Sequence, residues 1–268
     1  MRFGKRLLCA SFLLLLAAGS ALAGPYAPAA GKPGSTAIHM DDPSFVAWAT
    51  GWQDYVVGTY DNSSTPVDSK WQTPDKALGK AAGTSFDIVT LGRGGSIVLT
   101  FSGGIGNGTG WDFAVFENSF NDTFLELAYV EVSSNGRDYF RFQNHSLTAS
   151  PVSAFGAVDP TNIDGFGGKY RQGYGTPFDL ASLAGVSPLL DINNVGYVRI
   201  VDICGDGTYL DTFGNVIYDP YPTTGSPGFD LDAIGVIHKA APVPIPAAAW
   251  LLGSGLIGLV GIRRSMKR

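Results

Sequence analysis

The sequence contains few cysteines and histidines for its length of 268 residues. Its two cysteines are Cys9, in an N-terminal segment that we expect to be removed, and Cys204. The mature chain therefore has no intramolecular disulfide, and its stability must come from core packing or bound ions. The three histidines do not have the spacing of a zinc-binding helix, and a cysteine pair is lacking, so the common zinc sites are excluded.

Glutamate is scarce as well. There are 20 aspartates but only three glutamates, with 36 glycines and 16 prolines. Aspartate favours turns and caps whereas glutamate favours helix interiors, so this composition is typical of a loop-rich β protein. All 23 acidic residues lie between the two ends of the chain, where only 11 lysines and arginines accompany them. The resulting negative charge excludes a basic nucleic-acid-binding surface.

Residues 1–23 have the pattern of a secretory signal peptide. Three early cations precede an apolar run over residues 7–18, and Ala21 and Ala23 supply the small residues of a cleavage site. The alternative, an N-terminal membrane anchor, is disfavoured because the run is too short to span a bilayer. We expect export through the Sec translocon.

The middle of the chain predicts an all-β domain over residues 41–238. It follows a flexible lead-in (24–40) and precedes a linker (239–244). Apolar or alternating segments at 96–101, 111–118, 129–142, 195–203 and 228–238 predict strands. Because such strands recur without helical periods between them, we expect a jelly roll or β-sandwich with long Gly/Asp-rich loops.

Two local structures can be specified further. Residues 129–142 predict a hairpin in which Asn135 and Gly136 form a type I′ turn. Its alternation directs Val130 and Val132 inward and Glu131 to solvent. A short helix is predicted over 176–185, with Pro177 in its first turn.

The C-terminal segment, residues 245–268, combines an apolar run with a basic end. The run over 247–262 is just long enough to cross a membrane, and four cations in the last six residues would remain on the cytoplasmic side. We therefore expect a single transmembrane helix.

This tail resembles the sorting signal of PEP-CTERM proteins. The resemblance lies in a short Val-Pro-x-Pro-Ala motif, an apolar span and a basic cluster in fixed order, carried by Val243, Pro244, Ile245, Pro246, Ala247, Arg263 and Arg264. It is closest to the variant with Val-Pro-Leu-Pro-Ala, from which Ile245 departs. The resemblance implies processing by an exosortase, a membrane-embedded protease-transpeptidase of Gram-negative bacteria that make exopolysaccharide. An ordinary tail anchor is the alternative.

The domain itself resembles galactose-binding-like jelly rolls of the discoidin type. The resemblance is carried by "FAVFENSF", "ELAYVEVSSNGRDYFRF", "YVRIVDI" and "GFDLDAIGVI". It implies a role in binding at the cell surface.

Acidic residues in loops predict a calcium site, since calcium binds six to eight oxygen ligands. The candidate ligands fall in one loop and in one strand: Asp202, Asp206, Asp211, Asp219, Asp230 and Asp232. The alternative is that these residues form turns and face solvent. Calcium is the only cofactor that we expect.

Aromatic residues in a glycine-rich loop predict a glycan-binding surface, because an aromatic ring stacks on a sugar ring. The candidates are Phe166, Tyr170 and Tyr174. As an alternative, Asp112 and Glu117 could serve a glycosidase as its paired carboxylates.

Together these patterns predict a non-enzymatic protein at the cell surface or in an extracellular matrix, associated with exopolysaccharide or biofilm. Two alternatives stay open: a secreted carbohydrate-active enzyme, and a structural matrix protein that binds no glycan.

The tail generates a direct prediction. We expect the mature protein to end near Pro246, because exosortase processing removes the apolar span. The intact mass of the surface-released protein measures this directly. A released form that still contains Trp250 would contradict the prediction.

Overall fold

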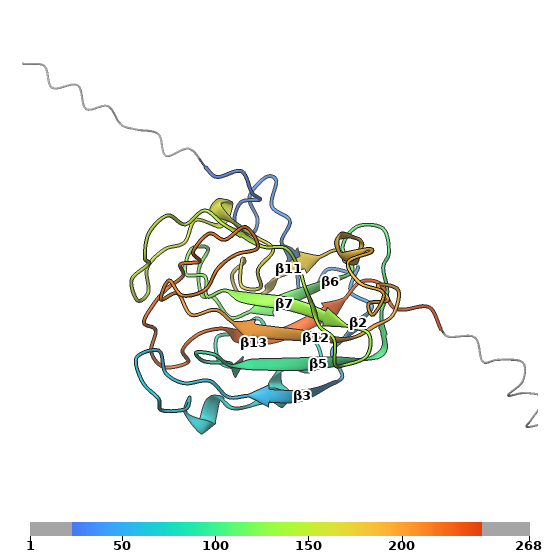
Figure 1. Ribbon diagram of the computed structural model, residues 1–268, viewed down its shortest axis with the longest axis horizontal. Coiled ribbons are helices and arrows are strands. Elements are labelled where there is room, and N and C mark those ends of the chain that lie inside the picture. The colour runs from blue at the N-terminus through green and yellow to red at the C-terminus, as the bar shows by residue number, and fades with distance from the viewer. Residues whose placement is uncertain (1–22, 243–268) are drawn as a thin grey trace, which may run out of the picture.

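The computed structural model describes residues 23–242, and these form an antiparallel β-sandwich (Figure 1). The predicted sorting signal (245–268), its motif from Val243 onward, and the predicted signal peptide, except for the exposed Ala23, lie outside the described residues. Within residues 23–242, we find no helix that is long and apolar enough to span a membrane.

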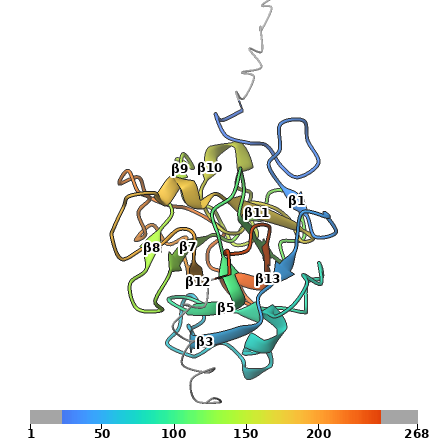
Figure 2. The same ribbon diagram turned by 90° about the vertical axis from the view of Figure 1, so that its right-hand side faces the viewer.

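The two sheets use strands from the whole described chain (Figures 1 and 2). One has the order β1-β11-β6-β13-β2, with β4 also paired to β13: β1 (Ile38–His39), β11 (Tyr174–Phe178), β6 (Phe113–Glu117), β13 (Asp230–Val236), β2 (Ala47–Trp48) and β4 (Val89–Thr90). The other has the order β3-β5-β12-β7-β8: β3 (Gly51–Val56), β5 (Ser96–Ile105), β12 (Val195–Asp202), β7 (Ala128–Ser133) and β8 (Phe140–Arg141).

Short elements complete the fold. A small ladder pairs β9 (His145–Ser146) with β10 (Ile163–Asp164). Four 3₁₀ turns occur in the loops: η1 (Ser69–Trp71), η2 (Pro74–Ala77), η3 (Pro160–Asn162) and η4 (Leu180–Leu183).

The main core lies between the facing sheets. One sheet contributes Val115 and Leu231, and the other contributes Leu99, Val130 and Ile200. Two smaller apolar clusters lie under loops on the outer faces, around Phe116 in one case and around Phe166 and Ile203 in the other. Loops therefore bury the outer faces of the strands, and the facing sheet buries their inner faces, which explains why all residues of β6, β7 and β13 are buried.

The predicted hairpin is confirmed in its pairing and wrong in its turn. Strand β7 pairs with β8 through Glu131↔Arg141 and Val132↔Phe140, and Val130 and Val132 face the core as predicted. A longer loop joins the strands, and of its residues only Gly136 has a positive φ, at 72°. The Asn135 side-chain oxygen shapes this loop by accepting hydrogen bonds from the N–H groups of Arg137 and Asp138.

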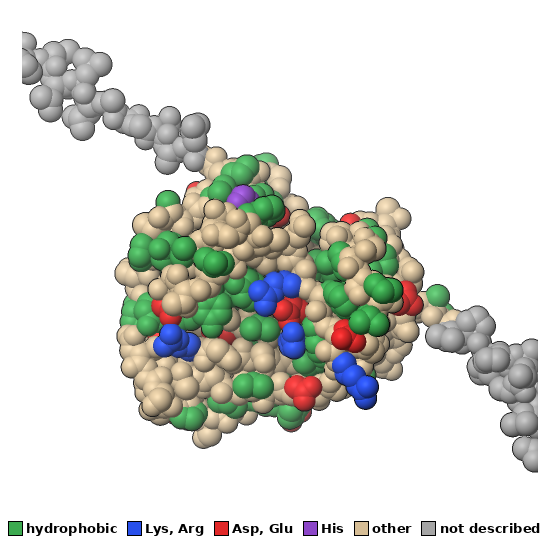
Figure 3. Space-filling view, viewed as in Figure 1, with side chains coloured by type: hydrophobic (Ala, Val, Ile, Leu, Met, Phe, Trp, Pro, Cys, Tyr) green, Lys and Arg blue, Asp and Glu red, His purple; other side chains and the backbone are tan. Residues whose placement is uncertain are grey.

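Glu131 does not face solvent as predicted. Its carboxylate accepts hydrogen bonds from Arg141 Nε (2.9 Å) and Arg199 Nε (2.5 Å), and it is buried. The two guanidinium groups pack on the rings of Tyr129 and Tyr139. Figure 3 shows basic and acidic side chains side by side in the middle of this face. Side chains from neighbouring strands therefore cover Glu131.

The predicted helix over 176–185 is present only as the short 3₁₀ helix η4 over Leu180–Leu183, and the first part of the prediction is wrong. Residues 174–178 form β11, with Thr176 opposite Val115 and Pro177 opposite Ala114 of β6. Asp179 then caps the short turn η4 by accepting a hydrogen bond from Ala181 N–H. Pairing with β6 overrides the weak local preference for a helix.

The stretch predicted as a flexible lead-in is packed on the sandwich. Strand β1 pairs with β11, and the Tyr26 N–H donates to the carbonyl of Thr161. At the other end, the Ala240 N–H donates to the carbonyl of Gly104. Both ends of the described chain are therefore hydrogen-bonded to the domain.

The ion pairs of Glu131 generate a prediction about stability. Glu131→Lys should destabilise the fold by roughly 2–4 kcal/mol, because it places a third cation between two arginines in a buried position. Val132→Asp should be at least as damaging because it buries an unpaired charge in the core. Thermal melts measure both effects.

The matched control is Arg137→Glu, an equally large charge change at an exposed position of the same hairpin loop. It should shift the melting temperature little. If Glu131→Lys proves as mild as this control, the arginine contacts contribute nothing to stability.

Candidate functional site

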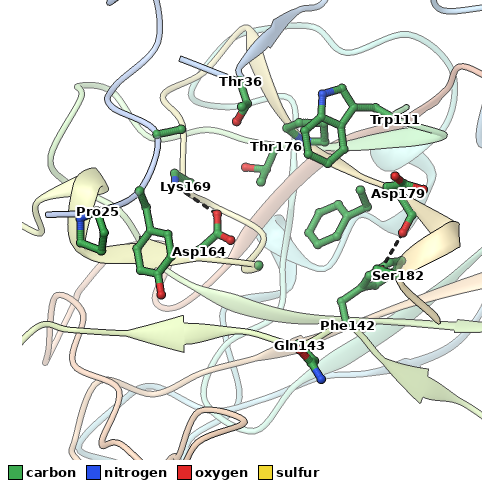
Figure 4. Close-up of a pocket in the computed structure, with 15 residues that line it drawn as sticks. Pro25, Thr36, Trp111, Phe142, Gln143, Asp164, Lys169, Thr176, Asp179 and Ser182 are labelled. Carbon is green, nitrogen blue, oxygen red and sulfur yellow. Dashed lines mark hydrogen bonds and ion pairs between the residues drawn. The ribbon is translucent and has the colours of Figure 1, made fainter. Parts of the chain in front are cut away.

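A cavity of about 430 Å³ opens where the N-terminal segment crosses the end of the sandwich (Figure 4). Its wall comes from segments far apart in sequence: Pro25, Tyr26 and Thr36, Trp111, Phe142 and Gln143, Asp164 and Lys169, and Thr176 to Asp179 with Ser182. Figure 4 shows Trp111 and Asp179 on one side of the cavity, with Lys169 and Asp164 on the other.

Lys169 is the positively charged group that lines this cavity, together with Asp164 and Asp179. Its side chain is buried, and its Nζ donates to the carbonyl of Ile163 (2.6 Å) and lies 3.4 Å from an Asp164 oxygen. Burial lowers the pKa of Lys169, while Asp164 acts in the opposite direction. The pair offers both a hydrogen-bond donor and an acceptor to a ligand while its charges largely cancel.

Aromatic groups provide the apolar part of the wall. Trp111 is 42% exposed at the mouth, and Phe142 and Phe178 pack together at a centroid distance of 4.9 Å. The Tyr26 hydroxyl forms a hydrogen bond with His145 Nδ1, which fixes its ring in the wall. An exposed indole beside polar groups is a typical arrangement for holding a sugar ring.

Thr176 adds a polar atom without a partner. Its Oγ1 is buried and has no hydrogen-bond partner within residues 23–242. Leaving a buried hydroxyl unpaired costs on the order of 1–3 kcal/mol. Because Thr176 lines the cavity, a ligand or water in the cavity can satisfy it.

The aromatic residues predicted to bind glycans lie elsewhere. Phe166 and Tyr170 are buried, and the Tyr170 hydroxyl bonds Thr36 Oγ1 at 2.8 Å, so neither ring is available for stacking. Tyr174 is only partly buried, and it packs against His39 and the Arg171 guanidinium. The structure does not bring these three residues together into one surface.

The six predicted calcium ligands also do not form one group. Within residues 23–242, we find no set of three or more His, Cys, Asp or Glu side chains arranged to hold a metal ion. Asp206 pairs with Arg93 at 2.7 Å. Asp211 instead accepts hydrogen bonds from the N–H groups of Ser146, Phe213 and Asn215. The calcium site stays a prediction.

The other four predicted ligands are buried and are not exposed turn residues. Three of them accept hydrogen bonds from loop N–H groups. Asp202 accepts from Phe229 (2.8 Å), Asp219 from Leu127 (2.8 Å), and Asp232 from Ala82 and Gly83. Asp230 bonds side chains instead, namely Thr90 Oγ1 and Asn118 Nδ2.

Burial has a large effect on the protonation of these acids. It raises the pKa of Asp202 to about 8, and the negative charges of Asp61 and Asp230 act in the same direction. The Oδ2 atom of Asp202 has no hydrogen-bond partner among the described residues. Burial also raises the pKa of Asp219 well above its usual range.

The carboxylate pair considered for a glycosidase is not assembled. Asp112 and Glu117 lie five residues apart along an extended strand, a separation of about 16 Å, whereas glycosidases hold their carboxylates roughly 5–9.5 Å apart. Asp112 is also fully engaged, because it accepts hydrogen bonds from Gly108 N–H, Leu180 N–H and His238.

The cavity-lining residues Tyr26, Trp111 and Lys169 were missed as site residues. Trp111, next to the glycine-rich stretch at 103–110, was the available signal, since a tryptophan in a polar loop is often functional. Lys169 lies in the glycine-rich stretch predicted to bind glycans, next to Tyr170, but was not chosen as a site residue there. Tyr26 carries no such local pattern, because only the fold brings it to the cavity.

Comparisons with protein-family models, with curated proteins and with solved structures gave no match to this chain.

The raised pKa of Asp202 predicts the pH dependence of stability. Its pKa in the folded state exceeds the value of about 3.9 in an unfolded chain, so the folded state binds more protons between these values. Stability should therefore fall as the pH rises from 4 to 8, with Asp202 contributing on the order of 4 kcal/mol between pH 5 and 8.

Denaturant titrations in the presence of EDTA at pH 5 and pH 8 measure this loss. Asp202→Asn should reduce the pH dependence without abolishing it, because burial also raises the pKa of Asp219. Asp87→Asn, at an exposed aspartate, should leave the dependence unchanged. If the free energy of unfolding of Asp202→Asn changes with pH as much as that of the unmodified protein, then Asp202 is ionised in the folded protein.

Proposed function

We propose that this chain is an exported, non-enzymatic protein that binds extracellular polysaccharide through the cavity at Trp111. The observation that carries the proposal is the combination of an exposed indole, a buried Lys169 paired with the exposed Asp164, and an unpartnered Thr176 hydroxyl around about 430 Å³. A sugar ring offers an apolar face to Trp111 and hydroxyl groups to the polar wall.

The wall has no excess positive charge to hold an anionic ligand. Asp164 offsets the Lys169 cation, and the Asp179 carboxylate, which caps η4, keeps its negative charge. A polysaccharide rich in hydroxyl groups fits this chemistry better than a polyanion, because the overall protein is acidic.

The proposed delivery depends on the two ends of the sequence. A Sec signal peptide exports the chain, the apolar tail holds it in the inner membrane, and an exosortase then releases it to the cell surface or matrix of a Gram-negative bacterium. The resemblance to PEP-CTERM tails supports this route. The two-sheet architecture supports the finer proposal of a jelly roll of the galactose-binding-like type.

Glycan binding by the mature protein tests the proposal. Trp111→Ala should weaken binding to the best-bound polysaccharide on a glycan array about tenfold, because a stacking contact of roughly 1.4 kcal/mol is lost. Trp52→Ala is the matched control, since Trp52 is 40% exposed and lies on β3 away from the cavity.

Three outcomes are informative. Equal weakening in both variants would contradict a site at Trp111. A complete lack of glycan binding would favour a purely structural matrix protein. Cleavage of the bound glycan would favour the carbohydrate-active enzyme.

A further inference from the structure

A second cleft of about 330 Å³ lies where the loop after β6 meets the loops before β4 and before β13. Its lining combines aromatic rings with acidic and polar side chains and includes Phe86, Phe120, Phe155, Asn118, Glu126 and Asp230. This cleft is separate from the cavity at Trp111 and does not depend on the function proposed for that cavity.

The rim of the cleft is aromatic and exposed. Phe86, Phe120 and Phe155 are each more than half exposed. Phe124 lies between two of them, stacked on Phe120 at 4.6 Å and on Phe155 at 5.6 Å. Three phenylalanines exposed around one opening form an apolar patch of the kind that marks a binding site.

The floor of the cleft is acidic and lacks a compensating cation. Glu126 is only 4% exposed and lines the cleft, and its Oε1 has no hydrogen-bond partner within residues 23–242. Glu117, whose charge acts on Glu126, does not line the cleft but is 1% exposed, and its Oε1 is likewise unpartnered among the described residues. Among the described residues, neither these glutamates nor Asp230 forms an ion pair with a lysine, arginine or histidine.

Backbone and side-chain hydrogen bonds hold this floor in place. The Ser119 N–H donates to the other Glu117 oxygen at 2.8 Å, and Asn118 Nδ2 donates to Asp230 at 3.1 Å. Burial raises the pKa of both Glu117 and Glu126 well above the usual range, and the nearby negative charge of Asp230 adds to this. A bound cation would stabilise the ionised form of these carboxylates and so offset the free-energy cost of burying their negative charge.

We propose that this cleft binds an organic ammonium group, with Glu126 as the countercharge and the exposed phenylalanine rings against its alkyl face. Buried carboxylates without cationic partners favour a cation, and aromatic rings around a pocket favour an organic one through cation–π contact. The volume of about 330 Å³ is that of a small organic group, and a bare metal ion would leave the aromatic rim without a role. An amino sugar and a methylated ammonium share this chemistry.

Isothermal titration calorimetry of the purified mature protein distinguishes an amino sugar from a methylated ammonium compound as the ligand. One arm uses chitobiose, which carries free amines, with N,N′-diacetylchitobiose as its matched neutral control. A second arm uses choline chloride, and a third uses calcium chloride. We expect binding of chitobiose, choline or both, and at least tenfold weaker binding of the acetylated disaccharide.

Two variants test the residues. Glu126→Gln removes the charge at nearly constant shape and should weaken the ammonium ligand at least tenfold. Phe120→Ala keeps the test usable if Glu126→Gln fails to fold, and should weaken binding about threefold or more. Phe213→Ala, at an exposed ring outside this cleft, should leave binding unchanged.

Several results would overturn the proposal. These are a lack of binding by both ammonium probes, equal binding of the acetylated disaccharide, or binding that Glu126→Gln and Phe120→Ala leave unchanged. Calcium binding that depends on Glu126, with no ammonium binding, would replace the organic ligand by a metal ion.

Discussion

Hydrogen bonds from loop N–H groups to buried aspartates join the long loops of this protein to its two sheets. Asp112 accepts from two loop N–H groups, Asp219 from Leu127, and Asp232 from two more in the loop before β4. Each bond satisfies a loop N–H that would otherwise lose its hydrogen bond to water on burial. The outer faces of the sheets can therefore be covered by loops with little regular structure.

This arrangement accounts for the unusual excess of aspartate over glutamate. The aspartate carboxylate lies close to its own backbone, so it can accept from a neighbouring loop N–H without a long, flexible side chain. The three glutamates differ from these aspartates in what surrounds their carboxylates. Glu131 reaches two arginines, whereas Glu117 and Glu126 lie under an aromatic-rimmed cleft without a cationic partner among residues 23–242.

The same loops create both clefts. Residues 24–36 and the loop ending at Trp111 enclose one cavity, and the loop after β6 forms much of the other. Rigid sheets with fixed loops between them are a common way to present a binding surface. Aspartate-to-backbone bonds thus link the composition of the chain to its proposed binding sites.

The strands of the sandwich were predictable because their apolar runs are local. Residues 96–101 and 195–203 were expected as strands and lie in β5 and β12. Long-range contacts explain the predictions that were wrong. Pairing with β6 made residues 174–178 a strand, arginines from β8 and β12 covered Glu131, and loop packing buried Phe166 and Tyr170. The cavity at Trp111 depends on chain segments as far apart as Pro25 and Ser182, which no local pattern records.

Amide hydrogen exchange at the loop residues bound to aspartates tests this account most directly. The N–H groups of Leu127, Leu180 and Phe229 lie outside the strands and donate to Asp219, Asp112 and Asp202. If these bonds hold the loops, the three amides should exchange as slowly as core amides of β12. Exchange at the rate of open loops would contradict the account.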